Sequence, residues 1–318
     1  MAVYTHVPAE EMAALLARYG VGALRSFKGI AEGVENSNYL VEAEGGRFIL
    51  TLYEKRVDAG DLPFFLALLD HLADRGLPVP RALKDEGGVQ VQTVAGRPAC
   101  LIEFLDGVSL SHPTPAQARA TGEALGRMHA ALADFTPERT NTLGLAGWRE
   151  LAGRCGTAVD EIAPGFSTRI ADELAYLDAH WPSGLARSVI HADLFPDNVL
   201  MLGDRVTGMI DFYFACSEVR AWDVAVTHSA WAFSADGRDF DAAVGAALLE
   251  GYGAAHPLSD AERAALPVLA RGSALRFTLT RAWDWLNTPA DALVTRKDPL
   301  AFLRRLDFYA NNPECFTA

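Results

Sequence analysis

The sequence has no long hydrophobic run and no tract rich in Lys or Arg. Half of its 318 residues are hydrophobic, but no stretch reaches the roughly 18 apolar residues of a membrane-spanning helix. Acidic residues outnumber basic ones by 41 to 28, and the formal net charge is -13. Nucleic acids and anionic membranes attract basic proteins. We therefore expect neither as a partner, whereas the hydrophobic content predicts a sizeable folded core.

Cysteine is scarce, and its spacing gives no sign of a zinc site. The four cysteines are far apart and form no CxxC pair: Cys100, Cys155, Cys216 and Cys315. This favours reduced, mostly buried thiols in a cytoplasmic protein, with a disulfide pair as the alternative. The N-terminus lacks the basic start and apolar core of a signal peptide. A GxxxxGK[ST] phosphate loop is also absent, so a nucleotide site would have to be built differently.

The periodicity of apolar residues changes along the chain. Up to residue 105 it predicts helices over 8–19 and 61–75, a hairpin turning at Gly45-Gly46, and two strands about a Gly96-Arg97-Pro98 turn. Further on it predicts helices over 115–133 and 160–181, two short strands within 189–214, and mainly helices from 221. We expect an α+β protein with a small β-rich lobe over 1–105 and a larger helical lobe over 106–318.

One short stretch, HADLFPDN, gathers polar side chains between two apolar runs. His191, Asp193 and Asn198 fall within it, and Asp211 follows thirteen residues after Asn198, in MIDF. Carboxylates this close are costly to bury unless a cation joins them. Phosphoryl transfer needs one Asp to orient the attacking hydroxyl, and an Asn and a second Asp to hold Mg²⁺ against the phosphates. The stretch therefore predicts a magnesium-dependent phosphoryl-transfer site; a polar loop between buried strands is the alternative.

HADLFPDNVL and GMIDF together resemble the HGDxHxxN…ID[FW] signature of the aminoglycoside phosphotransferase and choline kinase superfamily. The resemblance implies a protein-kinase-like, two-lobed α+β fold whose small antiparallel N-terminal lobe binds ATP. It also implies that Asp193 is the catalytic base, that Asn198 and Asp211 are the magnesium ligands, and that His191 braces the loop. Two positions depart from the signature, because Ala192 stands for its Gly and Phe195 for its second His.

The family's nucleotide-binding segments have weaker counterparts here. GIAEGVENSN resembles its nucleotide loop, which implies that Gly29, Gly33, Asn36, Ser37 and Asn38 surround the phosphates; read alone, it is a hairpin loop. LIEFLDG resembles its hinge, which implies that Glu103, Phe104 and Leu105 offer main-chain groups to adenine; an ordinary buried strand explains it equally well.

One departure affects the phosphate-binding cation. Thr51 aligns with the Lys that kinases place on the strand after the glycine loop, and Lys55 and Arg56 follow closely. Strand alternation puts Lys55, not Arg56, on the face of Thr51, although both side chains can simply be exposed. Less neutralisation of the phosphates by the protein would leave more of it to Mg²⁺.

Two further polar residues are expected to have structural roles. His129 lies in the middle of a predicted helix, where we expect a core or interface histidine. Asp223 precedes apolar residues in AWDVAV, and we expect its carboxylate to bond backbone around the catalytic loop rather than a metal.

The acceptor site is the least determined part of the sequence. In RFTLTRAWDWL, Arg281 and Asp284 lie one helical turn apart and could hold the carboxylate and the ammonium of an amino acid. Glu218 and Arg220, after IDFYFAC, are further candidates for the acceptor side. Clustered Trp residues could instead form a cation–π cage for a quaternary ammonium, and an aromatic core helix with charges at its rim is the non-functional explanation.

Within the superfamily, GVENSNYLV, FILTLYEKR, LPVP and HADLFPDNVL are most similar to the bacterial homoserine kinase family of this kinase-like type. This implies transfer of the ATP γ-phosphoryl group to the side-chain hydroxyl of L-homoserine, a step of threonine biosynthesis. The alternatives are a choline or ethanolamine kinase, an aminoglycoside phosphotransferase, and a catalytically silent nucleotide-binding regulator. The base and both metal ligands are present, which argues against the last.

Overall fold

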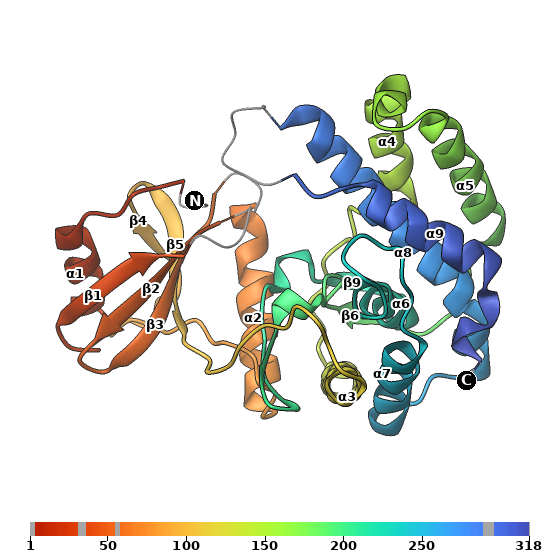
Figure 1. The fold of residues 1–318 in the computed structure, drawn as a ribbon. Helices are drawn as coiled ribbons and strands as arrows, with labels where there is room; N and C mark the ends of the chain where they lie inside the picture. The colour runs from red at the N-terminus through yellow and green to blue at the C-terminus, as the bar shows by residue number, and fades with distance from the viewer. Residues whose placement is uncertain (1–3, 31–35, 55–57, 289–295, 318) are drawn as a thin grey trace. The chain divides into compact units, whose positions relative to one another are not determined.

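A computed structural model describes residues 4–30, 36–54, 58–288 and 296–317. The chain forms two compact units, residues 1–106 and 107–318, which are described separately (Figure 1). The four cysteines are free thiols, and all but Cys315 are buried, as predicted. Among the described residues, no helix has the length and apolar composition needed to cross a membrane.

The N-terminal unit is built on a five-stranded antiparallel sheet with the order β1-β2-β3-β5-β4. Its strands are β1 (Leu24–Gly29), β2 (Ser37–Ala43), β3 (Gly46–Leu52), β4 (Gln92–Val94) and β5 (Arg97–Glu103). The predicted hairpin about Gly45-Gly46 is confirmed as β2 and β3. The second turn lies earlier than predicted, at Ala95 and Gly96, because these two residues have positive φ while Arg97 and Pro98 already belong to β5.

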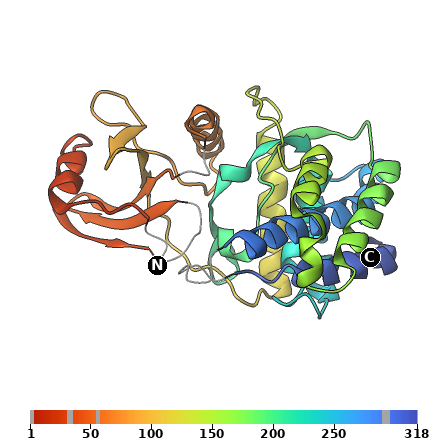
Figure 2. The ribbon, with the colours of Figure 1, turned by 90° about the horizontal axis from the view of Figure 1, so that it is seen from above.

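Two helices accompany this sheet, α1 (Ala9–Ala17) and α2 (Leu62–Asp74), close to the predicted ranges. Met12, Leu15 and Leu16 of α1 pack on the face of the sheet that carries Val41 and Leu50. The ribbon views place α2 on the other side of the sheet (Figures 1 and 2). In β2 every second residue is buried, as in a half-buried antiparallel sheet.

The C-terminal unit is mainly helical and contains two short antiparallel ribbons. Its helices are α3 (Pro115–Ala131), α4 (Leu145–Cys155), α5 (Phe166–His180), α6 (Arg220–Trp231), α7 (Ala242–Ala255), α8 (Asp260–Asn287) and α9 (Leu300–Asn311). The ribbons pair β6 (Arg187–Ile190) with β9 (Cys216–Val219), and β7 (Val199–Leu202) with β8 (Arg205–Met209). The prediction of only two strands in 189–214 was therefore wrong: the segment holds β7, β8 and the end of β6.

Helix α6 is buried along nearly its whole length, from Ala221 to Trp231. It packs against α8 and α7, and Figure 1 shows it enclosed by other helices of its unit.

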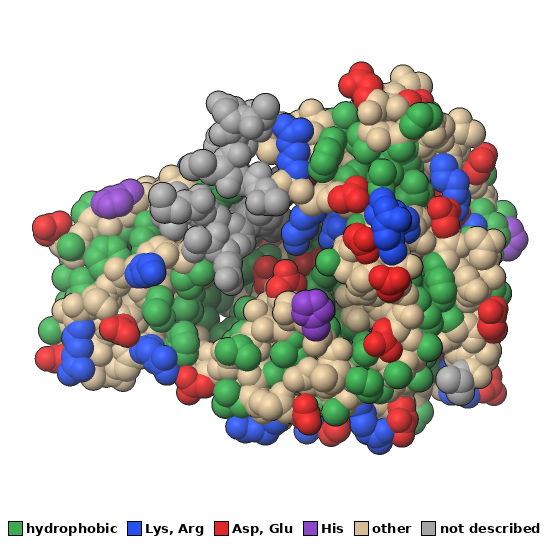
Figure 3. Space-filling view, in the orientation of Figure 1, with side chains coloured by type: hydrophobic (Ala, Val, Ile, Leu, Met, Phe, Trp, Pro, Cys, Tyr) green, Lys and Arg blue, Asp and Glu red, His purple; other side chains and the backbone are tan. Residues whose placement is uncertain are grey.

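Capping boxes begin α3 at Thr114 and α8 at Ser259, where side-chain oxygens satisfy the first backbone N–H groups. On the face shown in Figure 3, basic and acidic side chains are interspersed.

Candidate active site

The loop between β6 and β7 folds back on itself and brings Asp193 beside Asn198. The Phe195 N–H donates to the Asp193 carbonyl (2.8 Å), and the Asn198 N–H donates to the Phe195 carbonyl (2.9 Å). The Asn198 side-chain Nδ2 then donates to the carbonyl oxygen of Asp193 (2.8 Å) and to its Oδ2 (3.3 Å). Two residues that are five positions apart in the sequence, the predicted base and a predicted metal ligand, are thus in direct contact.

The β7–β8 hairpin returns the chain to this loop and places Asp211 next to it. The Ile210 N–H donates to the Asn198 carbonyl (3.0 Å), and Asp211 is the next residue. Asp193, Asn198 and Asp211 therefore lie in one cluster of loops within the C-terminal unit. Their nearness depends on the register of one short hairpin.

His191 ties the two halves of this cluster together. Its Nε2 is 3.0 Å from the Ile210 carbonyl, and its Nδ1 is 3.3 Å from the Asp193 backbone nitrogen. Burial lowers the pKa of His191, which favours a neutral ring with one donor and one acceptor. Nε2–H then donates to the carbonyl and Nδ1 accepts from the N–H, so the predicted bracing role matches its contacts.

Asp223 of α6 holds the start of the loop from inside the core. Its carboxylate, which is completely buried, accepts from the backbone N–H groups of His191 and Ala192, both at 2.8 Å. His129 Nε2 is 3.1 Å from the same carboxylate, and the Tyr252 hydroxyl is 2.9 Å from His129 Nδ1. Burial by itself would raise the pKa of Asp223, but these hydrogen bonds leave it below its usual value. The structural roles predicted for Asp223 and His129 are confirmed.

Two non-glycine residues of the cluster adopt left-handed backbone conformations. Ala192 has φ 64° and Asp211 has φ 65°. For a residue with a Cβ this conformation is about 1–2 kcal/mol unfavourable, and such residues are common at functional sites. At Ala192 it explains why the family signature has Gly, since glycine adopts this backbone without steric cost.

The structure gives a role to Arg276 of α8, which the sequence marks only as a charged residue among the aromatic residues of RFTLTRAWDWL. Its Nη2 lies 3.9 Å from Asp193 Oδ1, and its Nη1 donates to the Ala192 carbonyl. No local pattern identifies this role, because Arg276 is more than 80 residues from the loop. Only the packing of α8 brings the two together.

Glu218 and Arg220, which are predicted on the acceptor side, lie toward the end of the β6–β9 ribbon that is farther from the catalytic loop. In the β6–β9 ribbon, Cys216 pairs with Ile190 beside the loop, whereas Val219 pairs with Arg187 at the opposite end. The antiparallel direction therefore carries Glu218 and Arg220 away from the catalytic loop.

Both side chains are also engaged elsewhere. Glu218 accepts from Asn141 Nδ2 (3.2 Å) and pairs with Arg187 (3.4 Å). Arg220 forms a two-pronged ion pair with Glu262 (2.6 and 2.7 Å). These contacts explain the two residues structurally, and we do not retain them in the acceptor site.

Arg281 of α8 is partly buried and interacts electrostatically with Asp193. Burial lowers the pKa of Arg281 to about 10, and the charges of Asp193, Asp298 and Asp197 oppose this shift. Its guanidinium carbon lies 4.4 Å from the centre of the Phe302 ring, and its Nη1 donates to the Asp298 carbonyl (3.3 Å). Asp284, one turn later on α8, is partly exposed.

In the N-terminal unit, the predicted nucleotide loop falls partly outside the described residues, Gly33 included. Gly29 ends β1. Asn38 of β2 accepts a hydrogen bond from Thr51 Oγ1 (2.8 Å), so the residue at the usual Lys position is buried and paired with the neighbouring strand. Asn36 Oδ1 accepts from the Glu54 N–H (3.3 Å). Lys55 and Arg56 also lie outside the described residues.

Ser37 is a correction to the predicted phosphate donors. It is completely buried, and its hydroxyl accepts from the backbone N–H groups of Tyr4 (2.8 Å) and Thr5 (3.1 Å) while donating to Glu54 (2.7 Å). These three bonds use its hydrogen-bonding capacity within the protein. Its side chain anchors the N-terminal segment instead.

The predicted hinge leaves β5 at Glu103. The Glu103 N–H donates to the Arg81 carbonyl (2.9 Å), and Phe104 stacks under the Arg47 guanidinium at 4.2 Å. The backbone of Leu105 has no hydrogen bond to the described residues, so its polar groups can serve a ligand.

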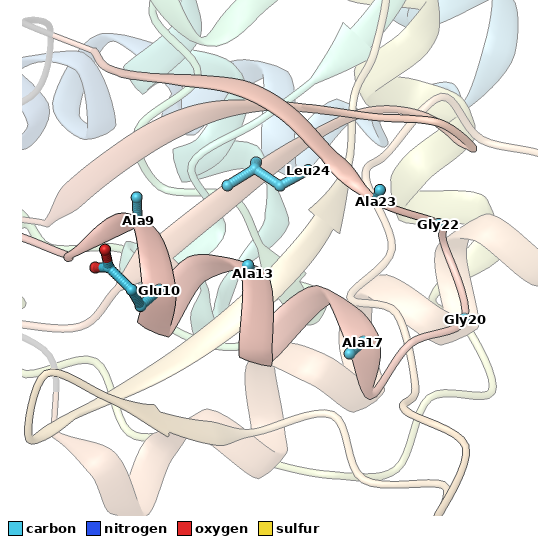
Figure 4. Close-up of a pocket in the computed structure, with 8 residues that line it drawn as sticks. All are labelled: Ala9, Glu10, Ala13, Ala17, Gly20, Gly22, Ala23 and Leu24. Carbon is cyan, nitrogen blue, oxygen red and sulfur yellow. The ribbon is translucent and has the colours of Figure 1, made fainter.

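Two pockets of this unit are lined by residues outside the predicted nucleotide loop, and the smaller of them includes Glu103 of the predicted hinge. One, of about 780 Å³, is a groove lined by small residues of α1 and the chain leading into β1, including Ala9, Ala13 and Ala17 (Figure 4). The other, of about 420 Å³, is lined mainly by charged residues such as Asp70 and Arg81. Neither gathers the chemistry that the catalytic loop predicts.

The donor atoms of the cluster suit a hard cation. Among the described residues no three His, Cys, Asp or Glu side chains gather as a metal site, but the predicted ligands are one Asn and one Asp. Because Asn198 Nδ2 bonds to Asp193, its Oδ1 is the atom left for a cation. Two protein oxygens fit Mg²⁺, which takes few protein ligands and completes its shell with phosphate oxygens and water.

Fold and loop together define a protein-kinase-like phosphotransferase, and similar solved structures confirm the predicted α+β class. An amicoumacin kinase, hAmiN, has a TM-score of 0.70 at 16% identity, over 96% of this chain and 94% of its own. A choline kinase from Cryptosporidium parvum has a TM-score of 0.67 at 16% identity, over 91% and 89%.

Sequence comparison gives the family itself. The model of the phosphotransferase enzyme family matches residues 26–263, and the chain belongs to this family. It is 56% identical to a homoserine kinase of Zymomonas mobilis over 97% of each chain. It is 53% identical to a homoserine kinase of Xanthobacter autotrophicus over 97% of this chain and 96% of the relative.

Proposed function

We propose that the protein is an ATP-dependent homoserine kinase, a phosphotransferase with an alcohol acceptor. The observation that carries this proposal is the 56% and 53% identity to homoserine kinases over nearly the full length of the chain. The similarity extends over 97% of this chain and therefore covers both of its units. The superfamily resemblance seen in HADLFPDN and MIDF agrees with it.

In the proposed reaction the side-chain hydroxyl oxygen of L-homoserine attacks the γ-phosphorus of ATP. A new P–O bond forms, the bond between the γ-phosphorus and the β–γ bridging oxygen breaks, and ADP leaves. Asp193 orients the hydroxyl and takes its proton. His191 and Asp223, through the contacts described above, hold the loop that presents Asp193. Most of the catalysis then comes from positioning.

We assign Asn198 and Asp211 as the ligands of Mg²⁺. A magnesium ion bound there would join the phosphates and neutralise the charge that develops during transfer. The solved complex of hAmiN contains AMP-PNP and Ca²⁺, which supports a nucleotide and a divalent cation in this fold; the choice of Mg²⁺ rests on the ligand set.

We assign the adenine contact to the backbone of Leu105, flanked by Glu103 and Phe104, and the phosphate cover to the segment from Gly29 to Asn38. Leu105 carries the stronger support, since its backbone has no hydrogen bond to the described part of the chain. Asn36 and Asn38 contribute by shaping the loop, because both already bond to neighbouring residues.

Arg281 is our candidate for the acceptor carboxylate. It is a partly buried cation whose charge interacts with Asp193, and Arg binds carboxylates through paired N–H groups. A cation in this position favours a zwitterionic amino acid over choline or an aminoglycoside, which carry only positive charge. Asp284 stays a candidate for the acceptor ammonium.

An acceptor panel tests the proposal. ADP release is measured with L-homoserine, choline, hydroxylysine and kanamycin, and phosphohomoserine is identified by mass. We expect kcat/KM for L-homoserine to exceed that for the other acceptors by at least roughly 100-fold. A preference for choline or kanamycin would contradict the proposal, and ATP binding without transfer to any acceptor would favour the catalytically silent regulator.

A further inference from the structure

We propose that Arg276 is a positioning residue for Asp193: it fixes the orientation of the catalytic carboxylate from the core of the helical unit. This inference rests on the proposed function, in which Asp193 is the base. It adds a residue from α8 to the base and the metal ligands, which the sequence places between β6 and Asp211.

The first support is that the two carboxylate oxygens of Asp193 face different partners. Oδ1 lies 3.9 Å from Arg276 Nη2, and Oδ2 lies 3.3 Å from Asn198 Nδ2. Contacts on both oxygens restrict rotation of the carboxylate plane. The lone pair that meets the acceptor hydroxyl is thereby fixed before the acceptor binds.

The second support is that Arg276 also holds the backbone before Asp193. Its Nη1 donates to the Ala192 carbonyl, while Asp223 accepts from the Ala192 N–H on the other side. Arg276 of α8 and Asp223 of α6, two packed helices, therefore hold both backbone polar groups of Ala192, which has a left-handed conformation. A shift of either helix would move Asp193.

The third support is that the guanidinium is itself immobilised. The Arg276 side chain is 2% exposed, and its guanidinium carbon lies 4.5 Å from the Phe277 ring, 5.3 Å from Phe214 and 5.7 Å from Trp222. A planar cation packed among aromatic rings loses little further entropy when it binds a carboxylate. Arg276 is therefore a rigid support for the base.

Substitution of Arg276 should act on kcat more than on binding. We expect Arg276→Met, which keeps length and packing but not the donors, to lower kcat by about 100-fold, because misplacing a catalytic group by 1 Å costs this much. KM for ATP and for the acceptor should stay within roughly threefold. Arg276→Lys, which keeps a cation and one donor, should recover about tenfold of the lost kcat.

Arg305 of α9 is the matched control. It is also a buried arginine, it donates to the carbonyls of Ser229 (2.7 Å) and Ser234 (3.0 Å), and it packs 4.1 Å from the Phe302 ring. No contact to Asp193 is found for it among the described residues. Arg305→Met should lower the melting temperature to a similar degree as Arg276→Met, but keep kcat within roughly threefold of the wild type.

Three results would overturn the inference: kcat of Arg276→Met close to wild type, no recovery in Arg276→Lys, or an equal loss of kcat in Arg305→Met. If Arg276→Met does not fold, Arg276→Lys alone tests the inference. A kcat of Arg276→Lys as low as that of Asp193→Asn would contradict the inference, and a higher kcat would support it. Each variant is assayed with whichever acceptor the wild type uses, or by ATP hydrolysis if it uses none. If the wild type does not phosphorylate L-homoserine, the proposed function is wrong, but this inference can still be tested.

Discussion

His191 and Ile210 connect the two chain segments on which the proposed chemistry depends. The imidazole Nε2 donates to the Ile210 carbonyl at 3.0 Å, which fixes the residue before Asp211 relative to the loop that carries Asp193. The ring is completely buried, and the Ile210 end of the bond is partly exposed. The position of Asp211, the predicted metal ligand, is therefore fixed relative to Asp193, the predicted base. Substitutions of the two residues should affect turnover and magnesium binding separately.

Asp193→Asn should remove turnover and leave nucleotide binding nearly intact. The amide keeps the size of the carboxylate but is a poor proton acceptor, so kcat should fall by about 10²–10⁴-fold. Steady-state kinetics and ATP titration by calorimetry measure the two effects. Asp204→Asn, at an exposed residue of the β7–β8 turn, serves as control. Unchanged turnover in Asp193→Asn would rule out its role as base.

Asp211→Asn should weaken the magnesium dependence of nucleotide binding. Asn tolerates the left-handed backbone at this position, so the change removes charge without adding strain. The Mg²⁺ concentration for half-maximal ATP binding should rise at least about tenfold. An unaltered magnesium response would show that Asp211 is not a ligand.

Ala192→Gly should stabilise the protein, because Gly accepts φ 64° without strain. Relief of the strain exceeds the entropy that Gly adds to the unfolded chain, so we expect about 0.5–1 kcal/mol. Ala192→Val should instead cost at least about 2 kcal/mol, since a β-branched residue is poorly tolerated there. Urea unfolding measures both, and a destabilised Ala192→Gly would contradict the strain argument.

Gly122→Ala should destabilise the helix pair that supports His129. A Cβ at Gly122 of α3 would overlap the Leu248 carbonyl oxygen of α7, and forced separation of the helices should cost about 2–3 kcal/mol. Gly253→Ala is the matched control: it lies within α7, a Cβ there meets nothing within 4 Å, and it should stabilise by about 0.5–1 kcal/mol. Equal effects in the two variants would refute the close packing of α3 and α7.

Acid should destabilise the protein partly through His228. Burial lowers the pKa of His228 to about 3, whereas an unfolded histidine titrates near 6.5. Below about pH 6.5 the unfolded chain binds a proton that the folded protein excludes, so stability falls with pH by up to ~1.4 kcal/mol per unit until about pH 3.

His228→Gln removes the titrating group. Between pH 6.5 and pH 5.0 the wild type should therefore lose about 1–2 kcal/mol more of its free energy of unfolding than the variant does. Chemical unfolding at the two pH values measures the difference. Parallel pH profiles for the two proteins would mean that His228 is not buried in its neutral form.

The sequence by itself determined the family, the reaction class and the local chemistry of the site. Asp193 and Asn198 are five residues apart, and one hairpin returns Asp211 to them, so short-range constraints fix their meeting. The hairpin of β2 and β3 was predictable for the same reason. Where a prediction depended on strand direction, as for Glu218 and Arg220, nearness in sequence was misleading because β9 runs away from the loop.

Only the tertiary structure decided which distant side chains support the loop. Arg276 reaches Ala192 and Asp193 from α8, and His129 and Tyr252 reach Asp223 from α3 and α7. These contacts join residues up to about 120 positions apart, and they exist because large buried helix faces pack in one arrangement. The identity of a charged residue says nothing about that arrangement. The predicted base could therefore be identified from the sequence, whereas the distant side chains that contact its loop could not.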